Sequence, residues 1–209
     1  MIRKGELPVL ENIQDVDPII AIYFQFTQLK QLYRQGWVQA GVSMEQCETV
    51  AEHTLGVVML TALLGLHMKG VDGFDFEKAL LMALFHDFGE IYAGDFTPLD
   101  QISREEKHAL ELDAVQRVFG VLKDAQVIQS LWEEFEAGET AEAKFVKQVD
   151  RLEMGLQAGV YHQAGALEHP ESFISSMMEA VNSPALRKIA EEVEELTRED
   201  SQWNGIRLL

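Results

Sequence analysis

The segment from residue 49 to residue 69 constrains the fold more than any other part of the sequence. Its stretch from Thr54 to Leu66 contains thirteen residues without a charged side chain or a histidine, which is too short to span a bilayer as a helix. Apolar residues lie nearly all round the helix that this segment would form, as is typical of a helix in the middle of a helical domain. The sequence therefore predicts a central helix over residues 49–69.

Most other segments repeat apolar residues at the spacing of amphipathic helices, and none alternates convincingly at period two. One such pattern starts at Asp17-Pro18 and ends at Gly36, and Asp75 can cap a helix that reaches about Gly94. Further helices are predicted at about 103–120, 124–136, 140–164, 171–181 and 185–199. We therefore predict an all-α fold, with one domain over residues 1–209 and irregular ends.

The charge balance limits the partners that this chain can have. The sequence has 35 acidic and 17 basic residues, for a net charge of −18, and a field of that sign repels nucleic-acid polymers. A small anionic substrate would need a local positive charge, from a metal ion or an arginine.

The cellular compartment is predicted from cysteine content and from the N-terminal sequence. The lone cysteine, Cys47, excludes an internal disulfide framework and a multi-cysteine zinc site. The N-terminal residues contain no apolar signal core. We expect a cytoplasmic protein without a membrane partner.

Four polar residues fall on or beside the apolar faces of three predicted helices. His53 shares a stripe with apolar neighbours, His86 and Asp87 follow an apolar run, and Asp150 lines up with Val149. Buried charge is costly unless something pairs with it, and a metal ion is one such partner. Two imidazoles and two carboxylates form a mixed nitrogen and oxygen set, which suits Mn, Fe, Co, Ni or Zn. The set predicts one divalent transition metal.

Each of these residues also has a purely structural explanation. A histidine on an apolar face, such as His53, is more often a hydrogen-bonded core residue than a ligand. Asp87 could be a helix-end charge, and Asp150 could pair with a basic neighbour. The solvated face of the helix over residues 140–164 is predicted to consist of Glu153, Lys144, Lys147 and Arg151.

Short sequence motifs add a resemblance to a known family. The segments "VAEHT" at 50–54, "FHDFGE" at 85–90 and "KQVD" at 147–150 resemble the H…HD…D signature of the HD-domain phosphohydrolases. "RQGWV" at 34–38, "AGDFTPLDQISREEKHA" at 93–109 and "AEAKFVKQVDRLEM" at 141–154 resemble the 5′-deoxynucleotidase group of that family. The resemblance covers roughly residues 20–165 and implies an HD-domain helical bundle.

The resemblance implies a role for each matching residue. The implied metal ligands are His53, His86, Asp87 and Asp150. Glu90 matches an acid beside the metal-bound water, and Asp95 matches an acid at the sugar and leaving-group side. Arg34 and Trp37 match a basic and aromatic pair that helps to hold the nucleotide. The implied reaction is hydrolysis of deoxyribonucleoside 5′-monophosphates, and the implied assembly is a homodimer.

Two other functions remain compatible with these residues. The same ligands would serve a phosphohydrolase for another phosphate ester or nucleotide. Alternatively, the chain could be a non-catalytic, nucleotide-binding regulator that keeps the site, although Glu90 and Asp95 argue against that function.

Overall fold

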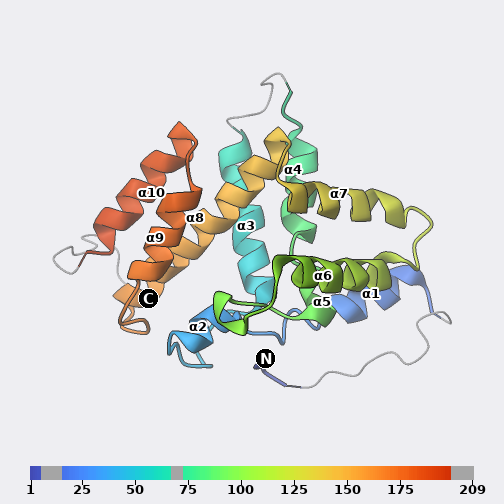
Figure 1. Cartoon of the computed structure of the whole chain (residues 1–209), viewed down its shortest axis with the longest axis horizontal. Coiled ribbons are helices and arrows are strands. Elements are labelled where there is room, and N and C mark those ends of the chain that lie inside the picture. The colour runs from blue at the N-terminus through green and yellow to red at the C-terminus, as the bar shows by residue number, and fades with distance from the viewer. Residues whose placement is uncertain (6–15, 67–72, 199–209) are drawn as a thin grey trace.

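The computed structural model describes residues 1–5, 16–66 and 73–198 (Figure 1). Its helices are α1 (Pro18–Phe26), α2 (Gln35–Gln39), α3 (Val50–Gly65), α4 (Phe76–Phe85), α5 (Glu90–Ala93), α6 (Arg104–Phe119), α7 (Ala125–Ala137), α8 (Ala141–Gln163), α9 (Glu171–Ala180) and α10 (Pro184–Leu196), with a 3₁₀ turn, η3 (Pro98–Asp100). Among the described residues, β-type backbone pairing consists of two isolated bridges, Arg3 with Leu32 and Tyr33 with Thr49. The predicted all-α fold is confirmed.

Helix α8 organises the described part of the chain, because it packs against α3, α4, α7, α9 and α10. In Figure 1, α9 and α10 lie at the left, α3 and α4 in the middle, and α1, α5 and α6 at the lower right. Close approach of α9 depends on Gly155 of α8, where a Cβ atom would collide with the side chain of Met177.

Two hydrophobic clusters meet where α3, α4 and α8 come together. One cluster extends from α3, α4 and α8 to α9 and α10 and includes Val57 and Val149, whereas the other extends to α1, α5 and α6 and includes Val50 and Phe88. His53 lies between Val50 and Val57 on α3 and is only 1% exposed. Polar side chains are therefore buried at the junction of the two clusters.

The helix ends follow local sequence rules. Thr49 and Glu52 form a capping box that starts α3, and Asp75 accepts a hydrogen bond from the amide of Lys78 at the start of α4. The predicted helix is confirmed from Val50 to Gly65, where Leu66 follows as its C-cap, but Leu55, Met59 and Leu63 leave one apolar face of it exposed. Residues 67–69 of the predicted range lie outside the described residues. Helices α6 to α10 begin within a residue or so of the predicted positions.

Two predicted helices were too long. The helix predicted to reach Gly94 ends at Phe85, and a turn separates it from the short helix α5. This turn brings Gly89 so close to α6 that a Cβ atom would lie 2.7 Å from Cβ of Glu111. The pattern predicted to run from Asp17 to Gly36 is divided into α1 and α2, because the chain between them turns to pair Tyr33 with Thr49.

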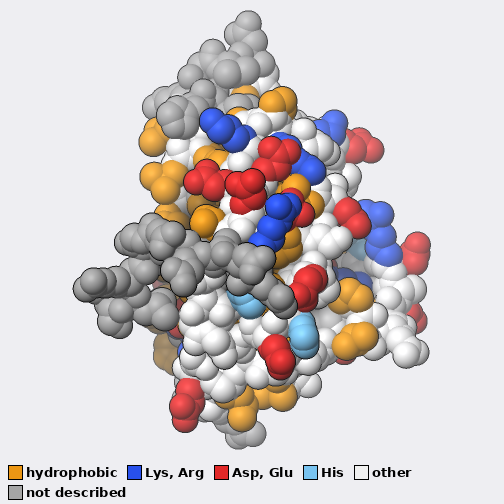
Figure 2. Space-filling view, turned by 90° about the vertical axis from the view of Figure 1, so that its left-hand side faces the viewer, with side chains coloured by type: hydrophobic (Ala, Val, Ile, Leu, Met, Phe, Trp, Pro, Cys, Tyr) orange, Lys and Arg blue, Asp and Glu red, His pale blue; other side chains and the backbone are white. Residues whose placement is uncertain are grey.

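The outer face of the C-terminal helices is strongly polar. Figure 2 looks onto the left-hand side of Figure 1, where acidic and basic side chains are interspersed. On α10, Arg187 pairs with Glu191 at 3.3 Å, and just beyond its end Arg198 pairs back with Glu194 at 3.7 Å. Among the described helices, none is both long and apolar enough to cross a membrane.

Candidate metal centre

The structure brings the four predicted ligands together from three helices. His53 lies in α3, His86 caps the C-terminus of α4, Asp87 follows it, and Asp150 lies in α8. Nε2 of His53 is 3.1 Å from Oδ1 of Asp150 and 3.7 Å from Oδ2 of Asp87. Nε2 of His86 is 3.2 Å from the same Oδ2. The helices thus focus two imidazoles and two carboxylates on one point.

Hydrogen bonds on the far side of each imidazole fix its orientation. Nδ1 of His86 donates to the backbone carbonyl of Ala83 at 2.8 Å, so its Nε2 lone pair faces the cluster. Nδ1 of His53 lies 2.6 Å from Oε2 of Glu153, so its Nε2 faces Asp150. Both rings therefore present the nitrogen that a metal would need.

Several buried polar atoms in this cluster have no hydrogen-bond partner among the described residues. These atoms are Nε2 of His86, Oδ2 of Asp87 and Oε2 of Glu90. Such atoms are costly to bury unless a ligand satisfies them. Potential ligand atoms of His53, His86 and Asp150 lie within 4.8 Å of one another. A divalent ion with mixed nitrogen and oxygen ligands fits these residues.

The protonation of the predicted ligands reflects their mutual attraction. Burial opposes protonation of His53, but hydrogen bonds to Asp150 and Glu153 outweigh it and raise its pKa to about 10. Burial would raise the pKa of Asp87, yet the adjacent His86 holds it well below its usual range. The pKa of Asp150 is likewise held low by His53, against the effect of burial. Metal binding would replace these protons as the positive charge between the carboxylates.

Arg34 connects the predicted ligands to the other two predicted acids. Its Nη1 lies 2.8 Å from Oδ1 of Asp95, 3.5 Å from Glu90 and 3.8 Å from Asp87. Oδ2 of Asp95 accepts a hydrogen bond from the backbone amide of Gln35 at 2.6 Å. Burial, and then repulsion by Asp87 and Asp95, raises the pKa of Glu90 well above its usual range. A buried carboxyl with a raised pKa and a guanidinium therefore lie side by side.

A cavity of about 630 Å³ opens beside the cluster, within the size range of small-molecule sites. Arg34, His53 and Asp95 contribute to its polar side. Trp37 also lines it but is only 2% exposed, because its ring packs 4.2 Å from that of Phe173 between ring centroids. Trp37 therefore shapes the cavity wall and presents little surface to an occupant.

The prediction of a solvated face on α8 was wrong for Glu153 and incomplete for Arg151. Glu153 is 7% exposed and contacts His53, whereas Arg151 is half-exposed and lines the cavity. The spacing of Asp150 and Glu153, three residues apart on one helical stripe, carried this signal. The cavity wall from α9, which includes Phe173, was not predicted at all.

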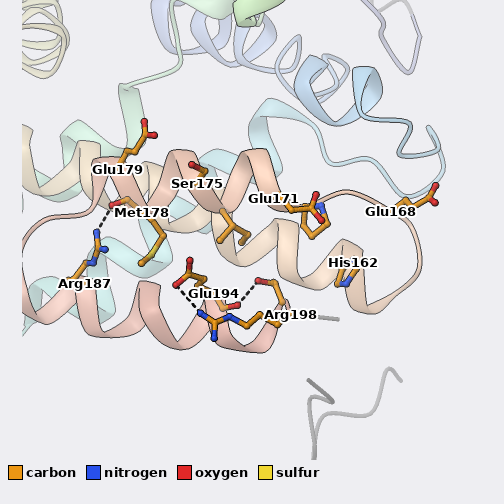
Figure 3. A pocket seen from close by; sticks show the side chains of 12 residues that line it. His162, Glu168, Glu171, Ser175, Met178, Glu179, Arg187, Glu194 and Arg198 are labelled. Carbon is orange, nitrogen blue, oxygen red and sulfur yellow. Dashed lines mark hydrogen bonds and ion pairs between the residues drawn. The ribbon is translucent and has the colours of Figure 1, made fainter. Parts of the chain in front are cut away.

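A second hollow, of about 650 Å³, lies between α8, α9 and α10 (Figure 3). Figure 3 shows that Arg187 reaches the backbone carbonyl of Met178 and that Glu194 pairs with Arg198. None of the predicted site residues lines this hollow. The candidate site is therefore confined to the α3, α4 and α8 cluster and the adjoining cavity.

Comparison with known proteins agrees with this geometry. Residues 26–195 match the HD domain family. The 5′-deoxynucleotidase HDDC2 of Dictyostelium discoideum is 37% identical over 176 residues, covering 80% of this chain and 92% of that protein. The human 5′-deoxynucleotidase HDDC2 is 35% identical over 173 residues, covering 80% of each chain. The crystal structure of the PH0347 protein of Pyrococcus horikoshii superposes with a TM-score of 0.71 at 30% identity, covering 85% of this chain and 99% of that one. The chain belongs to the HD domain family.

Proposed function

We propose that this protein is a metal-dependent phosphohydrolase that converts deoxyribonucleoside 5′-monophosphates to deoxynucleosides and phosphate. The observation that carries the proposal is the buried set of His53, His86, Asp87 and Asp150, with unpartnered ligand atoms, beside an arginine and a nucleotide-sized cavity. The 5′-deoxynucleotidase names of the relatives support this substrate class.

The chain's own residues divide the work of phosphate-ester hydrolysis. A bound divalent ion would supply Lewis acidity toward a phosphoryl oxygen and lower the pKa of a water molecule. Glu90, whose pKa is raised, aligns that water and accepts its proton as the water oxygen bonds to phosphorus. Arg34 binds the phosphate, and Asp95 holds Arg34 in place as the bond from phosphorus to the 5′-oxygen breaks. The leaving 5′-oxygen then takes up a proton.

A panel of substrates and metals tests this proposal. Phosphate release should require a divalent metal such as Mn, Co, Fe, Ni or Zn, stop on chelation and return when metal is restored. Deoxyribonucleoside 5′-monophosphates should be preferred to ribonucleotides and to 3′-monophosphates. Preference for a cyclic nucleotide, a triphosphate or a non-nucleotide ester would reject the substrate but keep the metal chemistry. No turnover with any divalent metal would favour a nucleotide-binding regulator.

The preference for a deoxy sugar can be tested separately from the metal site. Asp95 and Trp37 both line the cavity, and we propose that they select the sugar, Trp37 by shaping the wall against which a 2′-hydroxyl group would be crowded. A misfit of that kind is worth roughly 10- to 100-fold in selectivity. We expect Asp95→Asn and Trp37→Ala to reduce the ratio of deoxy to ribo kcat/KM. Equal ratios in wild type and both variants would place sugar recognition elsewhere.

We further propose that the chain forms one HD domain, acts in the cytoplasm and assembles as a homodimer. Leu55, Met59 and Leu63 support the dimer, because they recur every four residues on α3 and are 68%, 52% and 56% exposed. An exposed apolar stripe of this kind commonly marks an interface between copies. Light scattering should report a dimer for wild type and a monomer for Met59→Glu.

A further inference from the structure

Glu153 is buried against the outer side of a predicted metal ligand. Its side chain is 9% exposed, that of His53 is 1% exposed, and Oε2 lies 2.6 Å from Nδ1 of that imidazole. Asp150, one turn earlier on α8, contacts the opposite ring nitrogen at 3.1 Å. The imidazole is therefore held between two carboxylates, of which only Asp150 faces the metal centre.

Helix α3 has a gap that accommodates this carboxylate. A Cβ atom at Gly56 would lie 2.5 Å from Oε1 of Glu153 and 3.0 Å from its Cδ. Glycine is unfavourable inside a helix, so its presence in the first half of α3 has a steric explanation here. Any larger residue at position 56 would push the carboxylate away from His53.

The two histidines are oriented in different ways. Nδ1 of His86 donates to the backbone carbonyl of Ala83, which no side-chain substitution removes. Nδ1 of His53 has a side-chain partner, Glu153. Loss of Glu153 should therefore disturb one of the two imidazoles and leave the other in place.

On this basis, and resting on the proposed metal-dependent function, we propose that Glu153 is a positioning residue for metal binding. It accepts the Nδ1–H of His53, fixes the tautomer whose Nε2 lone pair faces the metal centre, and strengthens that nitrogen as a donor. Carboxylates that orient a ligating histidine in this way typically contribute 10- to 100-fold to metal affinity. Gly56 is the residue that makes room for it.

The decisive measurement is the affinity of the metal-free protein for Mn²⁺, by competition with a chelating dye. Glu153→Gln keeps the size of the side chain and should weaken Mn²⁺ binding by roughly 10- to 100-fold. Gly56→Ala keeps the carboxylate but displaces it, and should weaken binding in the same direction. For both variants, saturating Mn²⁺ should restore most of kcat, because Glu153 touches neither substrate nor the reacting atoms.

Glu45→Gln is the matched control. Glu45 and Glu153 both line a third hollow, of about 530 Å³, on the outer side of α3, and Glu45 is exposed. Neutralising it removes one negative charge nearby without touching His53, so Mn²⁺ affinity should stay at the wild-type value. An equal loss in Glu45→Gln would mean that net charge alone controls affinity, and would overturn the proposal.

Other outcomes also decide the question. Wild-type affinity in Glu153→Gln, or failure of both Glu153→Gln and Gly56→Ala to fold, would overturn the positioning role. A second Mn²⁺ in wild type that Glu153→Gln abolishes, without weakening the first, would make Glu153 a ligand instead. Absence of Mn²⁺ binding by wild type would overturn both this inference and the proposed function. Tight binding without phosphate release would reject only the proposed function.

Discussion

Charged side chains at or near helices α4 and α8 gather in two regions. The two regions differ in whether other protein groups pair with the charged atoms. Near the N-terminal ends of the two helices, Glu142 accepts a hydrogen bond from the amide of Asp75 at 2.6 Å and pairs with Lys78 at 2.9 Å. Lys78 also pairs with Glu134 at 2.7 Å. About 12 Å further along α8, at 1.5 Å per residue, Asp150 belongs to the proposed metal centre, where neighbouring side-chain atoms lack hydrogen-bond partners among the described residues.

The difference separates charge that stabilises the fold from charge that is available to a ligand. In the Lys78, Glu134 and Glu142 cluster, protein groups alone satisfy the buried carboxylate, as expected of a structural ion pair. In the proposed metal centre, buried atoms stay without a partner among the described residues, which costs stability and is typical of a functional site. Substitutions at the two places should therefore affect different properties.

Removing a ligand should have the largest effect. Asp87→Ala takes away the carboxylate that lies 3.2 Å from His86 and 3.7 Å from His53. We expect metal content near zero and phosphate release at the background rate, with helical circular dichroism retained. Elemental analysis is the measurement, and full metal occupancy in this variant would remove Asp87 from the ligand set.

Removing the proposed base should have the next largest effect. Glu90→Gln keeps the shape of a side chain that is 4% exposed, but it cannot accept a proton. We expect kcat to fall on the order of 10² to 10⁴, the usual contribution of general acid–base catalysis. Metal content should stay at the wild-type level. Wild-type kcat in this variant would show that Glu90 has no role in the reaction.

Disrupting the structural cluster should lower stability and leave catalysis intact. Glu142→Gln removes the charge that pairs with Lys78, and a lost charged hydrogen bond of this kind costs about 2 kcal/mol. Urea unfolding should show that loss, whereas kcat and metal content should match wild type. A large fall in kcat at unchanged stability would contradict the distinction between the two places.

The sequence predicted which polar side chains come together, because helical spacing is enough to place them on facing stripes. His53, His86 and Asp150 each follow from an apolar stripe that must face the core. Glu153 was misjudged, since its charge suggested solvent, and only the three-dimensional packing shows the gap at Gly56 that receives it.

The sequence patterns did not predict contacts between segments that lie far apart in the chain. The end of α4 at Phe85 depends on the close approach of Gly89 to α6, which no local pattern encodes. The cavity wall from α9 likewise depends on how α9 packs beside α2, where Phe173 meets Trp37.

Glu111 on α6 offers the most discriminating test, because it is a buried carboxyl whose pKa responds to burial more than to its ion pair. It is 6% exposed, lies against Gly89, and pairs with Nζ of Lys107 at 3.4 Å. Burial raises its pKa to about 7, although Lys107 opposes the change. For Glu142, in contrast, the amide of Asp75 and Lys78 outweigh burial and lower the pKa.

These opposite pKa shifts predict opposite pH dependences of stability. The folded chain binds the Glu111 proton more tightly than the unfolded chain does, so its stabilising contribution is present below the unfolded pKa of 4.5 and is lost as pH rises toward 7. Between those values, wild type should lose on the order of 3 kcal/mol relative to Glu111→Gln, since the pKa rises from 4.5 to about 7 and one pKa unit corresponds to about 1.4 kcal/mol. Relative to Glu142→Gln, wild type should instead gain stability as pH rises from below 4.5. Urea unfolding of the three metal-free proteins from pH 2.5 to pH 8 measures both slopes, that of Glu142 below pH 4.5 and that of Glu111 above it. Slopes of the same sign would show that the two carboxyls do not differ as their contacts indicate.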